Sequence, residues 1–238
     1  MSYREITRKL KKESNPLKAA ILARFFKTKK GEYGYGDRFI GVTVPTQRTI
    51  ARAHLDIDLR TIERLLESAT HEYRLTALLI LTYQFKKGDH AKKQQIYQYY
   101  LKKIECINNW DLVDTSAHTI VGEYLLLHPT HKKILHTLAR SKNIWKRRIA
   151  IVATHAFIRA GQFDETVHLS RLLLADNHDL IHKAVGWMLR EVGKRHKQTL
   201  LEFLNTYGAS MPRTSLRYAL EHCTPKEKAY FMHQTRRT

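Results

Sequence analysis

The sequence predicts an all-α protein, an α-solenoid of repeated helices with a short irregular or hairpin insertion near residues 31–45. Three observations predict this fold. Only ten glycines and five prolines occur in 238 residues, so few positions interrupt helices. Apolar residues recur at helical spacing, as in "LRTIERLLESA", where Leu59, Ile62, Leu65 and Leu66 share one face. Similar helical segments also recur at a nearly constant interval along the chain.

Local signals mark where helices begin and end. Ser14 or Asn15 is expected to cap a helix whose first residue is Pro16. In "CTPKEK", Thr224 and Glu227 have the spacing of a capping box. The glycine of "IRAGQFD" is expected to end one helix before the next begins. These signals divide most of the chain into helices.

The stretch "GEYGYGDRFIGVTVP", residues 31–45, departs from the helical pattern. It holds four of the ten glycines and a β-branched alternation in "RFIGVTV". A short hairpin and an ordered loop both fit this composition. No GK[ST] follows the glycines and no strand clearly precedes them, so the stretch lacks the phosphate-binding motif.

Five segments share a polar or charged residue, then a small residue, then apolar positions: "EYRLTALLIL", "LVDTSAHTIVG", "KRRIAIVATHAF", "IHKAVGWMLREVG" and "TSLRYALEH". Their markers are Arg74, Asp114, Arg148, Lys183 and Arg217, spaced by 40, 34, 35 and 34 residues. Arg147 fits nearly as well as Arg148. This period, with two helices per unit, is typical of HEAT-type solenoids, whose concave face is a binding surface. We therefore expect one HEAT-like repeat domain over residues 1–238.

Charge indicates the kind of partner. The 42 Lys and Arg residues exceed the 22 Asp and Glu residues, giving a formal net charge of +20 and a pI near 10.0. Such an excess favours a polyanion, most commonly nucleic acid. The basic markers are therefore candidate DNA-binding residues: Arg74, Arg147 or Arg148, Lys183 and Arg217. The alternative is a generally basic surface without a dedicated partner.

Other classes fit the sequence poorly. The two cysteines, Cys106 and Cys223, form no CxxC motif, and the amino-terminal residues lack the apolar stretch of a secretory signal. We expect a cytoplasmic protein without a membrane span. The histidines of "LHPTHKKILHT" do not form an HExxH motif, and neither cysteine is flanked by a plausible base. No metal or other cofactor is therefore expected.

Asp114 is the acidic member of an otherwise basic row of markers, and it shares a helix face with Trp110, whereas Asp111 and Val113 turn elsewhere. A carboxylate in a basic groove weakens attraction for phosphate, so it suits another task. It can stabilise a developing cation or orient a water molecule. The alternative is a salt bridge to a neighbouring arginine.

The aromatic and basic candidates also have structural alternatives. For Trp110 and Trp187 that alternative is packing between repeats, and Trp145 is expected in the core. Gly186 next to Trp187 is compatible with a ring exposed over a closely packed helix. Arg148 is expected to be either a solvated charge or a phosphate contact.

The segments "NNWDLVDTSAH", "IWKRRIAIVATHAFIRAG" and "DLIHKAVGWMLREVGKR", in this order and spacing, resemble the HEAT-like repeat DNA glycosylases of the bacterial AlkD type. The resemblance covers nearly the whole chain and is strongest from about residue 70 to residue 222. It implies a helical solenoid that removes cationic alkylated purines, 3-methyladenine and 7-methylguanine, from double-stranded DNA. It also implies that Asp114 is catalytic, that Trp110 and Trp187 line the groove, and that Arg148 holds the DNA backbone.

The resemblance further implies a monofunctional base-excision-repair enzyme that acts as a monomer and needs no base-binding pocket. The sequence has no obvious pocket-forming insertion. It departs from the family at residues 31–45 and at Phe25, which stands where a tyrosine faces DNA. Some relatives bind distorted or branched DNA without excising bases, so a non-enzymatic DNA-binding repeat protein is the first alternative. A protein–protein adaptor of the general HEAT kind is the second.

Overall fold

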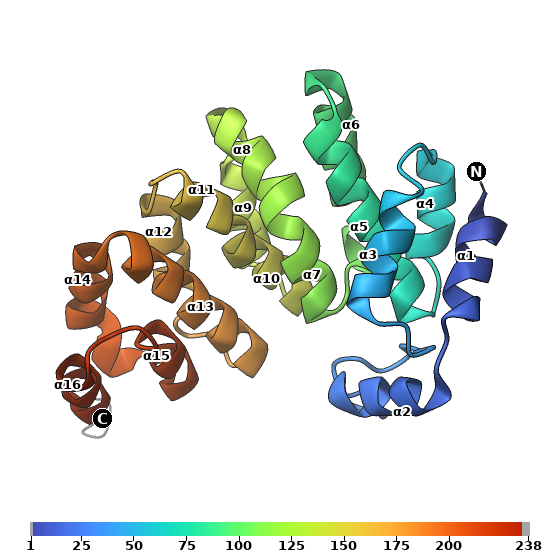
Figure 1. Cartoon of the computed structure of the whole chain (residues 1–238). Coiled ribbons are helices and arrows are strands. Elements are labelled where there is room, and N and C mark those ends of the chain that lie inside the picture. Colours follow the sequence, from blue (N-terminus) through green and yellow to red (C-terminus); the bar gives the residue numbers. More distant parts are fainter. Residues whose placement is uncertain (1, 235–238) are drawn as a thin grey trace. The chain divides into compact units, whose positions relative to one another are not determined.

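The computed structural model describes residues 2–234, and within this range it contains helices and loops but no strand (Figure 1). The chain forms two compact units, one ending at Ile120 and the other beginning at Val121. The all-α prediction is confirmed. The expectation of a single repeat domain over residues 1–238 stays a prediction.

Unit 1 contains seven α-helices and one short 3-10 helix within its described residues. They are α1 (Tyr3–Lys12), α2 (Pro16–Phe25), α3 (Val44–Arg52), α4 (Leu59–Leu66), α5 (His71–Lys87), α6 (His90–Lys102), η1 (Ile104–Cys106) and α7 (Trp110–Ala117). A π-helical turn, η2 (His118–Glu123), follows α7. Helix α5 is the centre of this unit, because α3, α4, α6 and α7 all pack against it. Its apolar residues from Leu75 to Phe85 are almost completely buried.

The loop between α2 and α3, residues 26–43, contains the predicted insertion and is called the glycine-rich loop below. It is an ordered loop and not a hairpin, and Val44 and Pro45 already belong to α3. Gly41 explains part of this shape: its φ is +81°, and a Cβ there would lie 2.1 Å from the Asn15 carbonyl oxygen. Only glycine suits that conformation and that close approach.

The N–H groups of the glycine-rich loop also bond to a side chain where a hairpin would use a second strand. Glu72, at the start of α5, is 1% exposed. Its carboxylate accepts hydrogen bonds from the backbone N–H groups of Ile40 (3.0 Å), Gly41 (2.8 Å) and Val42 (3.4 Å). The Glu72 carboxylate thus accepts the backbone hydrogen bonds that a second strand would accept in a hairpin. The loop therefore runs along the beginning of α5.

Unit 2 contains the remaining helices of the described range. They are α8 (Tyr124–Leu127), η3 (Pro129–His131), α9 (Lys133–Ala139), α10 (Ile144–Ala153), α11 (His155–Arg159), α12 (Asp164–Leu172), α13 (Asp179–Arg195), α14 (Lys197–Tyr207), η4 (Gly208–Ser210), α15 (Arg213–Ala219) and α16 (Pro225–Gln234). Helix α13 packs against α10, α14 and α15. Trp145 on α10 is 7% exposed, which confirms its predicted place in the core.

The local signals predicted the helix ends well. The Asn15 side chain caps α2 by accepting from the Lys18 N–H at 3.0 Å, and Pro16 is the first residue of that helix. Thr224 and Glu227 form the reciprocal hydrogen bonds of a capping box at α16. Gly161, with a φ of +75°, lies between α11 and α12. Each of these signals acts within four residues, so tertiary packing does not override it.

The repeat register is also consistent with the structure. The five markers lie on α5, α7, α10, α13 and α15, each three or four residues after the first residue of its helix. The recurring pattern therefore corresponds to equivalent helices of a helical-repeat fold.

Candidate functional site

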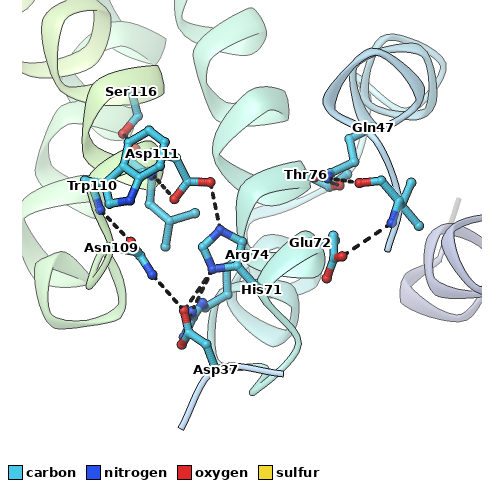
Figure 2. A network of polar contacts seen from close by, with 12 residues as sticks. Asp37, Gln47, His71, Glu72, Arg74, Thr76, Asn109, Trp110, Asp111 and Ser116 are labelled. Carbon is cyan, nitrogen blue, oxygen red and sulfur yellow. Dashed lines mark hydrogen bonds and ion pairs between the residues drawn. The ribbon is translucent and has the colours of Figure 1, made fainter. Parts of the chain in front are cut away.

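The start of α7 is fixed by Asn109, whose side chain is completely buried. Its Oδ1 accepts a hydrogen bond from the Trp110 N–H at 2.8 Å, and its Nδ2 donates to Asp37 Oδ2 at 3.0 Å (Figure 2). The cap thus joins the first turn of α7 to the glycine-rich loop. Trp110 and Asp114 are held on a helix whose beginning has little freedom.

Asp114 lies one turn after Trp110 on α7, and both residues are partly exposed. Between them, Leu112 and Val113 are fully buried, so α7 separates a core face from a partly exposed face. On the buried side, the hydroxyl oxygens of Tyr100 and Ser116 lie 3.0 Å apart. Burial raises the pKa of the Tyr100 phenol and the charge of Asp114 raises it further, so the phenol stays protonated.

Trp110 belongs to a cluster of aromatic rings with two consecutive residues at the end of α2. Its indole is stacked on Phe26, with ring centroids 5.1 Å apart and planes 9° apart. Phe25 meets the indole edge-on at 5.9 Å and is itself 62% exposed. Phe25, Phe26 and Trp110 are called the aromatic shelf below. Trp110 is therefore neither wholly in the core nor isolated on the surface.

Beneath the aromatic shelf, His71 lies between two carboxylates. Its Nδ1 is 2.9 Å from Asp37 Oδ2 and its Nε2 is 2.8 Å from Asp111 Oδ2 (Figure 2). Burial alone would lower the pKa of His71, but Asp111 and Asp37 outweigh it and raise the pKa to about 9. Burial likewise opposes ionisation of Asp37, but His71 and Arg74 lower the pKa of that carboxyl below its usual value.

Arg74, one of the predicted basic markers, is part of the same network. It is 6% exposed, and its Nη2 lies 2.5 Å from Asp37 Oδ1. The positive charge of Arg74 is therefore paired with the buried carboxylate of Asp37.

In unit 2, Trp187 on α13 is partly exposed and lies beside His155, with ring centroids 6.1 Å apart. Burial lowers the pKa of His155, so this imidazole adds no positive charge at pH 7. The neighbouring Gly186 is required by packing, because a Cβ there would lie 2.4 Å from the Ser215 carbonyl oxygen on α15. The sequence was compatible with an exposed ring over a closely packed helix, and the structure has a partly exposed indole beside such a helix.

The predicted basic residues of unit 2 differ in how many hydrogen bonds and ion pairs they form within the protein. Arg147 donates through Nε to Asp176 at 2.5 Å and through Nη1 to the carbonyl groups of residues 141 and 142. Arg148 is 4% exposed and donates to the Leu180 carbonyl oxygen. Lys183 forms a 2.7 Å ion pair with Asp179, and the two side chains are 40% and 56% exposed.

Arg217, on α15, is exposed. An exposed ion pair such as that of Lys183 is worth little. Lys183 and Arg217 are thus the most accessible of the predicted cations.

The sequence showed no obvious pocket-forming insertion, yet the glycine-rich loop lines a cavity in the structure. That the protein needs no base-binding pocket stays a prediction. The glycine-rich loop and α3, together with α2, α5 and α7, line an apolar cavity of about 370 Å³ that is open to solvent. Its lining includes Ile21, Phe26, Phe39, Val42 and Leu75. The acidic groups at its wall already have partners, since Asp111 bonds to His71 and Glu72 accepts from the loop backbone.

No motif or spacing in the sequence pointed to His71, Asp37 or Glu72. The pairs they form are separated by about 30 to 40 residues, and no spacing rule within one helix reports such contacts. The available signal was weak: an aspartate in the glycine-rich stretch and a histidine beside a glutamate at a helix start. No helix within residues 2–234 is long and apolar enough to cross a membrane.

The chain matches the family model described as "DNA alkylation repair enzyme" over residues 6–223. One similar solved structure is a predicted DNA alkylation repair enzyme from Enterococcus faecalis. It is 19% identical with a TM-score of 0.71, and the match covers 90% of this chain and 98% of that one. Another is AlkD2 from Streptococcus mutans, 16% identical with a TM-score of 0.51, covering 91% and 94% of the two chains.

No curated protein matches the chain. At these identities the two structures establish the helical-repeat fold, and the family model covers nearly the whole sequence. The chain therefore belongs to the family of DNA alkylation repair enzymes.

Proposed function

We propose that this protein is a monofunctional DNA glycosylase. It hydrolyses the N-glycosidic bond of cationic alkylated purines, such as 3-methyladenine and 7-methylguanine, in double-stranded DNA. It acts as a cytoplasmic monomer in base excision repair and needs no cofactor. The observation that carries the proposal is Asp114, a partly exposed carboxylate one helical turn from Trp110, in a chain of net charge +20.

The chemistry follows from the charge of the substrate. Alkylation at N3 or N7 makes the purine cationic, so it is a good leaving group without protonation. The remaining barrier is positive charge that grows on the deoxyribose as the bond breaks. The Asp114 carboxylate stabilises that charge and orients the attacking water. The indole faces of Trp110 and Trp187 attract a cationic sugar or base by about 0.5–2 kcal/mol each.

The contacts to the DNA backbone are proposed from accessibility and from the resemblance. Lys183 and Arg217 are exposed enough to exchange solvent or a weak ion pair for phosphate. Arg148, which is 4% exposed and donates to the Leu180 carbonyl oxygen, is retained on the resemblance. Arg74 and Arg147 are not proposed as contacts to the DNA backbone, because their guanidinium groups are paired with buried aspartates.

The apolar cavity does not suit the cationic base. The carboxylate of Glu72 is saturated by backbone N–H groups, and Asp111 is paired with a histidine whose pKa is raised to about 9. A cation entering this cavity would lose its water without gaining a free anion. The proposal therefore places the lesion at Asp114 and Trp110 and not in the cavity.

The decisive experiment measures the release of free 7-methylguanine from duplex DNA under single-turnover conditions. In Asp114→Asn the rate is expected to fall about 100- to 1,000-fold, as when one group that stabilises a transition state is removed. DNA binding should persist. Asp56→Asn, an exposed aspartate of the same unit, is the matched control and should release base at the wild-type rate. Release that is unaffected by Asp114→Asn would refute the catalytic assignment.

The alternative is a non-enzymatic protein that binds distorted or branched DNA. The exposed Phe25 beside Trp110 favours it, since an aromatic shelf can stack on unpaired bases. It predicts no base release by the wild type and tighter binding to a junction than to a plain duplex. Both hypotheses predict that binding weakens with salt, with a log–log slope of about −0.9 per phosphate contacted. A protein–protein adaptor would lack that dependence.

A further inference from the structure

The strongest unexplained feature is the position of His71 between two carboxylates from distant parts of the chain. Asp37 comes from the glycine-rich loop and Asp111 from the first turn of α7, and both bond to His71 at the start of α5. The His71 side chain is 2% exposed, so little water reaches its imidazole.

The two short contacts between His71 and carboxylate oxygens favour one protonation state of its imidazole. A neutral imidazole has one N–H and one lone pair, so only one of its nitrogens can donate to a carboxylate. The other lone pair would then face carboxylate oxygen at less than 3 Å, without a proton between them. An imidazolium donates from both nitrogens and satisfies both carboxylates.

The surrounding charges agree with this assignment. Facing His71 are Asp37 from the glycine-rich loop, Arg74 from its own helix and Asp111 from α7. With an imidazolium the two cations balance the two aspartates, whereas a neutral imidazole would leave one uncompensated buried negative charge. Glu72 does not alter the balance here, because it is turned to the backbone N–H groups of the loop.

Two aromatic rings complete the surroundings of the imidazole. The Phe39 ring is stacked on His71 at 4.6 Å with planes 24° apart, and the Phe26 ring lies at 4.9 Å. Ring faces favour a nearby cation. Phe26 in turn stacks on Trp110, so His71 touches the aromatic shelf directly.

We propose that His71 is a permanent imidazolium at neutral pH and a positioning residue, which joins the glycine-rich loop to α7 and thereby orients Trp110. Three consecutive residues of the α7 start are involved, since Asn109 also bonds to Asp37 and Trp110 lies between Asn109 and Asp111. The effect on excision rests on the proposed function. The protonation state and the orientation of Trp110 do not.

The first test is nitrogen-15 NMR of the intact protein. At pH 7.5 both ring nitrogens of His71 should have imidazolium shifts, and they should titrate near pH 9. The indole N–H signal of Trp110, assigned with Trp110→Phe, should move with the same titration. A single protonated ring nitrogen at pH 7.5 overturns the imidazolium. A Trp110 signal that does not move as His71 titrates overturns the positioning role.

The second test uses variants and controls of the same residue type. His71→Gln removes the cation, and His90→Gln changes an exposed histidine of the same unit. With saturating protein, His71→Gln should slow base release by up to about 100-fold, the cost of an ångström-scale displacement. Its affinity for the duplex should be unchanged, and His90→Gln should match the wild type. Wild-type release in His71→Gln overturns the positioning role in excision.

Asp111→Asn keeps the histidine and tests the same inference if His71→Gln does not fold. The loss of one carboxylate should lower the pKa of His71 and move the Trp110 signal. The excision rate should decline as His71 loses its proton, and in Asp111→Asn this decline should begin at lower pH than in the wild type. An unchanged titration in Asp111→Asn overturns the proposal. If the wild type releases no base at all, the proposed glycosylase function fails, whereas the NMR titration still decides the state of His71.

Discussion

Replacing Glu72 with glutamine should loosen the glycine-rich loop while keeping the shape of the side chain. The carboxylate holds two well-formed backbone hydrogen bonds, from the Ile40 and Gly41 N–H groups at 3.0 and 2.8 Å, and a longer one from Val42. A hydrogen bond to a charged group contributes about 1 kcal/mol more than a neutral one, so two bonds lose about 2 kcal/mol. The new NH₂ group is buried without an acceptor, which costs about 1 kcal/mol or more.

The expected loss is therefore about 3 kcal/mol of local stability. Hydrogen exchange, measured by mass spectrometry on a peptide that covers residues 38–44, reports this directly. If these amides exchange by opening of the loop, the exchange rate should rise about 100-fold. Glu13→Gln, an exposed glutamate of the same unit, is the control and should leave the rate unchanged. A rise below about threefold in Glu72→Gln would refute the view that this carboxylate anchors the loop.

Three further predictions follow from the same structure. Gly186→Ala should destabilise unit 2 by about 1–3 kcal/mol in urea denaturation, because its Cβ would meet the Ser215 carbonyl at 2.4 Å. Gly208→Ala, whose nearest contact is 3.6 Å, is the matched control, and an equal loss in both would contradict the packing argument. The pKa of His71 is about 9 when folded and 6.5 in the reference state, so its contribution is complete below pH 6.5. About 3 kcal/mol should be lost as pH rises through 9, and His71→Gln should lack that loss in urea denaturation at each pH. Thr224→Ala should cost about 1 kcal/mol by removing a helix cap, and an unchanged denaturation midpoint would contradict the capping role.

The residues of "NNWDLVDTSAH" illustrate how far sequence reasoning reached into the candidate site. Helical spacing correctly separated the partly exposed Asp114 and Trp110 from the buried Val113. It did not identify what Asp111 does, because the partner of Asp111 is a histidine 40 residues earlier. One aspartate is thus a candidate for chemistry, and the other neutralises a buried cation.

For two of the predicted basic residues, the tertiary structure argues against a role in DNA contact. The sequence placed Arg74 and Arg147 among the DNA contacts because both fit the repeat. The structure pairs each with an aspartate, 37 residues earlier for Arg74 and 29 residues later for Arg147. Composition counts charges, but it does not report which charges are already neutralised inside the fold.

The sequence by itself determined the helices, their ends and the register of the repeat. Caps at Asn15 and Thr224 act through bonds within one helical turn, so a short window contains all the partners. Only the tertiary structure decided that the glycine-rich loop lines a cavity, that Glu72 anchors it and that His71 joins it to α7. Those features depend on groups brought together by packing across tens of residues, and their charge states depend on burial, which no local pattern records.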